Sequence, residues 1–264
     1  MKYVYLFVEG NTDKALIEAL LTKHYKLQNY KNRNDMPRLI SRQVENYPRS
    51  NGDLERNGRA AFLYSDHICV MLEQVGGKNR FAQRIEKRLV TASLESVDDD
   101  EKLIVVVIQD RDYDTDEHRI EELRNSFNRN KIFWENDRIS FKGEAYDFYE
   151  YCLPFDKNGA VEGVILEVAR KIHPDLWAEA EHFRQSIKGE KYKKYRKEWA
   201  ATEKHQELYA DKVHVGAITA VLKPDSSPAM MIMDKLIIID KLSDIQSIEE
   251  IQKLIDFLSG IIEG

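Results

Sequence analysis

The sequence predicts an α/β fold with a mainly parallel sheet flanked by helices, and three strand-helix units carry this prediction. Each unit begins with a short apolar run and continues into a segment whose apolar residues recur at helical spacing. The strands are expected at residues 2–8, 67–74 and 103–108. Because ligands bind beyond the carboxyl ends of such strands, the polar residues that follow each strand form the candidate site.

The first unit reads "KYVYLFV", then Glu9 and Gly10, then a helix expected at 11–23. Asn11 or Thr12 can cap this helix, which leaves Asp13 in the first turn, where free N–H groups favour an acid. Glu9 and Asp13 are four residues apart, so both carboxylates can point to the same side of the crevice. Both are therefore candidate metal ligands.

A polar insertion with two prolines separates the first two units, and a short strand is expected within it at 39–44. The second strand ends in Gly76-Gly77-Lys78. The two glycines let the backbone approach a phosphate closely, and Lys78 supplies a positive charge to it. A plain tight turn also explains the glycines, and taken alone they favour that interpretation.

The third strand runs into a cluster of carboxylates, at Asp110, Asp112, Asp114 and Asp116. Asp110 and Asp112 are separated by one residue, so in an extended segment both side chains point to one face. A solvated loop would tolerate the cluster, and so would a cation. An EF-hand is disfavoured because Thr115 stands where that loop requires glycine. A ligand set that consists of carboxylate oxygens and includes no His or Cys suits Mg²⁺ or Mn²⁺.

Three stretches together, "YLFVEGNTDKALIEALL", "EQVGGKNR" and "VVVIQDRDYD", resemble the Toprim domain. Topoisomerases, bacterial primases and nucleases of the overcoming-lysogenization-defect family share this domain. More narrowly, "LPFDKNGAVEGVILEVA" is similar to small uncharacterised bacterial Toprim-like proteins, in which a Gly-x-x-Glu helix follows the aspartate strand. The resemblance implies a Toprim-like Rossmannoid catalytic domain at 1–170 and a mostly helical C-terminal region at 171–264.

The resemblance also implies a function, that of a Mg²⁺-dependent nuclease. In the nucleases, residues that match Glu9, Asp110 and Asp112 hold the metals, and Glu9 would also act as general base or acid. An acid further along completes a second metal position, for which Glu162 is the candidate, although an ordinary acid at a helix start explains it equally. A non-catalytic module that binds metal and a phosphorylated ligand is the alternative function.

The second half offers a candidate surface for nucleic acid, either DNA or RNA. The basic residues between 188 and 199 alternate with aromatic residues that can stack on bases, and the candidates are Lys191, Lys193, Lys194, Arg196 and Lys197. A solvated helix explains this run equally. A separate ATPase subunit is a further expected partner, as in some bacterial antiphage systems, because the chain lacks the ATPase half of the larger nucleases.

An apolar stripe near the C-terminus includes Ile251, Leu254 and Leu258, and either core packing or a homodimer contact explains it. With 40 basic and 46 acidic residues, the chain carries no overall positive field, so any nucleic-acid surface must be local. The two cysteines form no CxxC pair, and every apolar run stops before the ~18 residues of a membrane span. A cytoplasmic protein without a membrane segment is expected.

Overall fold

The computed structural model describes residues 1–44, 52–54, 58–95, 101–112, 114–155, 157–187 and 203–264. The chain divides into two compact units, of which the first comprises residues 1–109 and 115–152. The second comprises residues 110–114 and 153–264. The predicted boundary near residue 171 falls inside helix α5 (Val161–Ile172), so the helix that carries Glu162 belongs wholly to the second unit.

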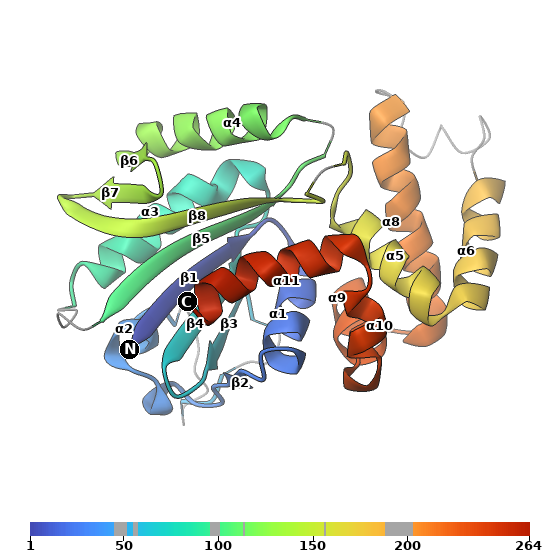
Figure 1. Cartoon of the computed structure of the whole chain (residues 1–264), viewed down its shortest axis with the longest axis horizontal. Helices are drawn as coiled ribbons and strands as arrows, with labels where there is room; N and C mark the ends of the chain where they lie inside the picture. The colour runs from blue at the N-terminus through green and yellow to red at the C-terminus, as the bar shows by residue number, and fades with distance from the viewer. Residues whose placement is uncertain (45–51, 55–57, 96–100, 113, 156, 188–202) are drawn as a thin grey trace. The chain divides into compact units, whose positions relative to one another are not determined.

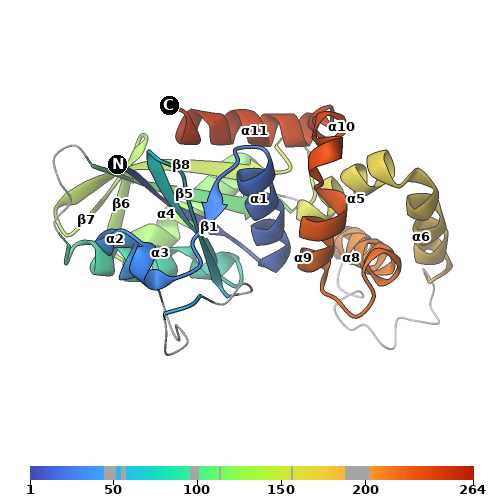
Figure 2. The same ribbon diagram turned by 90° about the horizontal axis from the view of Figure 1, so that it is seen from below.

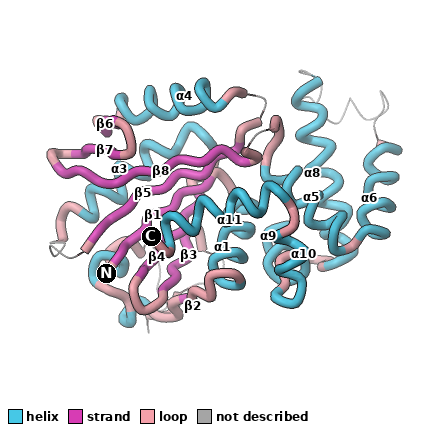
Figure 3. Tube along the Cα trace, viewed as in Figure 1, coloured by secondary structure: helices cyan, strands magenta, loops and turns pink. Residues whose placement is uncertain are grey.

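An eight-stranded sheet forms the centre of the first unit, in the order β2-β3-β4-β1-β5-β8-β7-β6 (Figures 1 and 3). The strands are β1 (Lys2–Val8), β2 (Gln28–Asn29), β3 (Ala60–Tyr64), β4 (Ile68–Gln74), β5 (Lys102–Asp110), β6 (Ile132–Glu135), β7 (Arg138–Phe141) and β8 (Glu144–Leu153). Strand β1 pairs in parallel with both β4 and β5, which confirms the three predicted strands and their parallel arrangement. Antiparallel pairs extend the sheet on either side, with β2 and β3 beyond β4 and with β7 and β6 beyond β8.

The central strands are apolar on both faces because both faces are covered. On one face, Tyr5 and Phe7 of β1 join a core cluster with α3 (Phe81–Ala92), α4 (Asp116–Arg129) and α2 (Arg38–Ser41). Leu6 and its neighbours alternate to the opposite face. Helix α1 (Asn11–Lys23) contacts β4 and takes no part in that cluster, so it covers the opposite face.

The strand predicted at 39–44 was wrong, because residues 38–41 form helix α2 after a short 3-10 helix η1 (Arg33–Asp35). A buried polar network fixes the segment that follows. Gln43 donates to the Tyr5 hydroxyl at 2.7 Å, and its carbonyl accepts from Arg88 at 2.6 Å. The guanidinium of Arg88 also lies 2.7 Å from the fully buried carboxylate of Glu73. These hydrogen bonds satisfy the buried polar groups of the segment. The short apolar pattern at 39–44 gives no indication of such a network.

The second unit is helical, as predicted for the C-terminal region. Beyond α5, its helices are α6 (Pro174–Ser186), α8 (Glu203–Leu222), α9 (Pro228–Met231), η4 (Ile232–Leu236), η5 (Ile239–Lys241), α10 (Leu242–Gln246) and α11 (Glu249–Ile262). Helices α5, α6 and α8 pack against one another (Figure 2). The C-terminal stripe lies on α11, where Ile251, Leu254 and Leu258 are buried within the single chain, which favours core packing over a homodimer contact.

Candidate functional site

Two groups of the predicted residues come together, each within its own unit. The first group lies at the carboxyl ends of β1 and β4, where Val8 is paired with Gln74. Glu9 follows β1, and its backbone carbonyl accepts hydrogen bonds from the N–H groups of Gly76, at 2.9 Å, and Gly77, at 3.1 Å. The glycine turn is therefore attached directly to the residue that carries the predicted catalytic carboxylate.

The glycines contribute to this turn in a different way from the one expected. Gly76 has a φ of +81° and Gly77 a φ of +119°, backbone conformations that residues with a Cβ rarely adopt. Their N–H groups are already donated to Glu9, so these two donors serve the turn and not a phosphate. Space remains open beside Gly77, where an added Cβ would meet nothing within 4 Å. Lys78, the third residue of the motif, is exposed.

Asp13 has a local structural role. Its Oδ2 accepts a hydrogen bond of 2.9 Å from the N–H of Gly10, the residue that caps helix α1. This contact satisfies a backbone donor at the helix start and places a negative charge at the positive end of the helix dipole. The side chain is buried, at 3% exposure. Capping thus explains why an acid stands at this position without a metal.

The second group gathers around the end of β5 and the start of α5, all within the second unit. Asp110 Oδ1 accepts a hydrogen bond of 2.9 Å from the N–H of Val161, the first residue of α5. Asp112 forms an isolated β-bridge with Gly159, whose N–H donates to the Asp112 carbonyl at 2.5 Å. The loop before α5 is therefore held by both predicted aspartates, and Glu162 follows Val161 on the helix.

The expected reason for grouping Asp110 with Asp112 was wrong. Strand β5 ends at Asp110, and Asp112 has a φ of +56°, which is left-handed and not extended. Strand alternation therefore does not apply across this pair. A positive φ is uncommon outside glycine, although aspartate adopts it more readily than most residues. Such strain persists where the surrounding structure imposes it, as the bridge to Gly159 does here.

Glu162 lies in the electrostatic field of this group. Burial raises the pKa of its carboxyl above the usual range, the ammonium of Lys212 lowers it in part, and the carboxylate of Asp112 raises it further. Lys212 Nζ lies 3.9 Å from Glu162 Oε1. Burial likewise raises the pKa of Asp211, on α8, to about 6, and Glu162 is among the carboxylates that add to the effect. Half-buried carboxylates that repel one another favour a bound cation.

The donors in this group fit Mg²⁺ or Mn²⁺. Asp110, Asp112 and Glu162 offer only hard carboxylate oxygens, the ligands these ions prefer. Asp110 is oriented by the hydrogen bond that its Oδ1 accepts from Val161. Burial disfavours the ionised form of Glu162 and raises its pKa, and a divalent ion would stabilise that ionised form.

A further set of possible ligands was missed in the sequence. Asp114, His118 and Glu122 offer ligand atoms within 4.8 Å of one another. His118 and Glu122 are exposed and Asp114 is half-buried. The signal was the i, i+4 spacing of His118 and Glu122 on α4, which brings their side chains together. Exposed acidic groups gather in this way without a metal as well, so the set is weaker than the group around Glu162.

The basic run that was expected to bind nucleic acid, with Lys191, Lys193, Lys194, Arg196 and Lys197, lies outside the described residues. Within the described part of the chain, no helix combines the length and the apolar character needed to cross a membrane.

Comparisons with known proteins support the fold. The crystal structure of hypothetical protein PH0156 from Pyrococcus horikoshii OT3 is similar, with a TM-score of 0.50 and 19% sequence identity. The similarity covers 99% of this chain and 95% of that one. At this identity it bears on the fold alone, and it agrees with the α/β architecture and helical C-terminal region. No curated protein matches the chain. Residues 3–263 match the family described as "Protein of unknown function (DUF3226)", and the chain belongs to this family.

Proposed function

We propose that the protein is a Mg²⁺- or Mn²⁺-dependent phosphodiesterase of the Toprim type that cuts nucleic acid. The observation that carries the proposal is the grouping of Asp110, Asp112 and Glu162 around the start of α5. These residues come from segments about 50 positions apart in sequence, and a cation site accounts for why three acids converge there.

In this proposal, Asp110, Asp112 and Glu162 hold the metal. The bound ion would lower the pKa of a water molecule and stabilise charge on a phosphate oxygen. The hydrogen bond from Val161 orients the Asp110 carboxylate at the end of β5. Lys212, 3.9 Å from Glu162, lowers the pKa of that acid in part and so favours its ionised form.

In the first unit, Glu9 is proposed as a metal ligand or as the general base. Its backbone is fixed by the two N–H groups of the glycine turn, so its position at the end of β1 is well defined. A group that transfers a proton must be held within hydrogen-bond reach of its target, and a fixed backbone favours this.

The test is a cleavage panel of single- and double-stranded DNA and RNA with Mg²⁺ and Mn²⁺. Wild type is compared with Asp110→Asn, Glu162→Gln and Glu9→Gln, and Asp244→Asn serves as the matched control. Asp244 lies in the same unit as Asp110 and is 49% exposed. We expect metal-dependent cleavage that the first three substitutions reduce at least about 100-fold and the control leaves unchanged. Circular dichroism checks that each variant is folded.

Two results would refute the proposal. One is the absence of metal-dependent cleavage of every substrate by the wild-type protein. The other is cleavage that Asp110→Asn and Glu162→Gln leave at the wild-type rate, because the acids around α5 would then play no part in it.

A further inference from the structure

A polar pocket in the first unit lies between α4 and the segment that follows β4. Its volume is about 240 Å³, and its lining includes Lys78, Gln109, Arg119, Glu122, Asn125 and Arg129. Gln109 is the residue immediately before Asp110 at the end of β5. The pocket thus lies at the carboxyl edge of the sheet, where ligands of α/β proteins bind.

The charges that line the pocket favour an anion. Three basic side chains, from Lys78, Arg119 and Arg129, face one carboxylate, that of Glu122. Within the described part of the chain, Lys78 and Arg129 form no ion pair. The amide groups of Gln109 and Asn125 add neutral hydrogen-bond donors.

Arg119 contributes a buried positive charge to the lining of the pocket. Its side chain is 1% exposed, and its Nη1 donates to Glu122 Oε2 at 3.3 Å. Arg119, Glu122 and Leu123 are spaced by three and four residues, so they occupy one face of α4. A guanidinium held in place by packing offers several donors in a fixed plane, which suits the oxygens of a phosphate.

The size of the pocket sets the size of its ligand. Pockets that hold drug-sized molecules measure roughly 300–1,000 Å³. A volume of about 240 Å³ falls below that range, and so it suits a single phosphate or phosphodiester link better than a whole cofactor.

We propose that this pocket binds a phosphate of a nucleic-acid strand through Lys78, Arg119 and Arg129. The inference rests on the proposed function, to which it adds a site that holds the strand by its backbone. It also gives Lys78 the phosphate contact that the sequence predicted, with side chains of α4 as partners in place of the glycine N–H groups.

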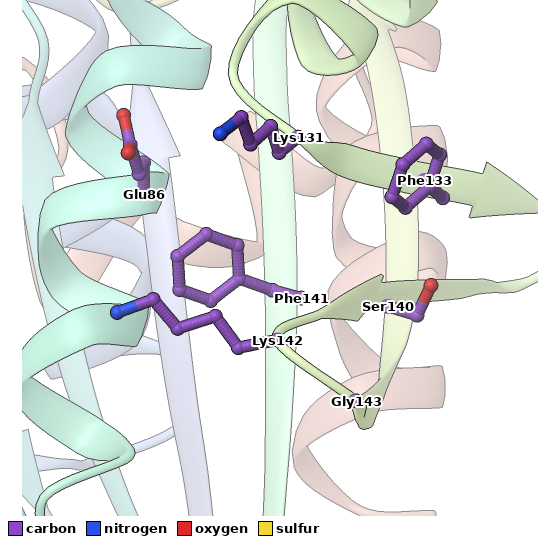
Figure 4. Close-up of a pocket in the computed structure, with 7 residues that line it drawn as sticks. All are labelled: Glu86, Lys131, Phe133, Ser140, Phe141, Lys142 and Gly143. Atoms are coloured by element: carbon purple, nitrogen blue, oxygen red, sulfur yellow. The ribbon is translucent and has the colours of Figure 1, made fainter.

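A second pocket of the same unit provides the control (Figure 4). It lies beside the β6–β7 hairpin, and its lining includes Lys131, Phe141 and Lys142. Figure 4 shows the Phe141 ring between the two lysine side chains, and Lys142 Nζ lies 5.4 Å from its centroid. This pocket has two basic groups and one acid, Glu86, but the described structure gives it no buried arginine. Replacing its lysines changes the charge of the protein equally.

The experiment measures fluorescence anisotropy of a labelled single-stranded DNA and a labelled single-stranded RNA with the full-length protein in EDTA. The double variant Lys78→Gln/Arg129→Gln is compared with Lys131→Gln/Lys142→Gln. We expect the first to raise Kd about tenfold and to lower the dependence of log Kd on log salt concentration by about 0.7, since each neutralised phosphate contributes ~0.7 on a single strand. The control should stay within about twofold of wild type.

Equal losses in the two double variants would overturn the inference, because they would reflect overall charge and not this pocket. No loss in either variant, or no binding of any strand by wild type, would overturn it too. A free-phosphate site is the other possible source of the same chemistry. In that case, millimolar inorganic phosphate would raise the Tm of wild type, and the Lys78 and Arg129 substitutions would abolish this rise while strand binding stays unchanged. This result would also overturn the inference. Because EDTA prevents metal-dependent cleavage, binding and nuclease activity fail or succeed separately.

Discussion

Replacing Asp211 with asparagine should stabilise the protein at neutral pH. Asp211 lies half-buried on α8, where burial raises its pKa from 3.8 to about 6 and the carboxylates of Glu162, Glu207 and Glu181 add to the effect of burial. Arg184 offsets only part of this. The folded protein therefore holds a charge at pH 7 that its surroundings disfavour, and asparagine has nearly the same shape without that charge.

The magnitude follows from the pKa. Because a tenfold change in an equilibrium constant corresponds to about 1.4 kcal/mol, ionising Asp211 in the folded protein costs at most about 3 kcal/mol at pH 7. The side chain retains some contact with water, so we expect about half of this, 1–2 kcal/mol. The folded state binds the proton more tightly than the unfolded state. The contribution of Asp211 to the stability of wild type therefore falls as pH rises from about 4 to about 6, and the stability advantage of Asp211→Asn grows over the same range.

Urea unfolding at pH 5, 6 and 7.5, followed by circular dichroism in EDTA, measures the free energy of unfolding of wild type and Asp211→Asn. Asp244→Asn is the control, because Asp244 is 49% exposed and pairs with Lys241 at 3.6 Å. The stability advantage of the Asp211 variant should increase from pH 5 to pH 6 and increase little further by pH 7.5, whereas the control should change little. A variant that is no more stable than wild type at pH 7.5, or a gain of equal size at every pH, would refute the reasoning.

The remaining predictions concern the candidate metal group and two ion pairs. Millimolar Mg²⁺ should raise the Tm of wild type but not of Asp110→Asn, and equal metal-induced Tm shifts in calorimetry would contradict this. Asp110→Ala should also lose about 1–2 kcal/mol of stability without metal, since alanine cannot accept the hydrogen bond from the Val161 N–H. Arg88→Met should cost about 3–5 kcal/mol in urea unfolding, because the buried Glu73 carboxylate loses its partner at 2.7 Å and keeps only Arg84, at 3.8 Å. Replacing both Arg88 and Glu73 by methionine should recover part of this cost. Glu181→Gln should cost about 1 kcal/mol of stability at pH 7, because hydrogen bonding to Arg184 lowers the Glu181 pKa to about 2. That cost should shrink as pH falls below about 4, and a cost independent of pH would argue against the ion pair.

The central sheet was predictable because burial on both faces leaves a plain signal. The apolar runs at 2–8, 67–74 and 103–108 became β1, β4 and β5, and β1 pairs with both of the others. The antiparallel strands carry a weaker signal, since β6 and β7 have four residues each and β2 has two. Strands this short hold too few alternating residues to stand out from a loop.

The candidate site was predictable by residue type but less so by geometry. Asp110 and Glu162 come together because the loop before α5 returns to the end of β5, a long-range contact that local spacing does not encode. Asp112 departs from the extended conformation because its backbone pairs with Gly159. Asp13 was a candidate ligand by spacing, yet the same spacing suits a helix cap.

Arg119 shows why a buried charge escapes sequence patterns. Helix α4 buries Arg119, Leu123 and Phe127, which follow one another at intervals of four residues. The apolar Ile120, which follows Arg119 in the sequence, is only half-buried. An arginine on the buried face is expected only when a partner such as Glu122 is known, and that partner depends on side-chain geometry.

The two outermost strands bear on how copies of the protein meet one another. The eight-stranded sheet ends in β2, with two residues, and in β6, with four. An exposed strand edge is a template on which another chain can add a strand, and short edges provide few unpaired backbone groups for this. Self-association through a continuous intermolecular sheet is thereby disfavoured, so the parallel strands at the centre can be strongly apolar without promoting aggregation.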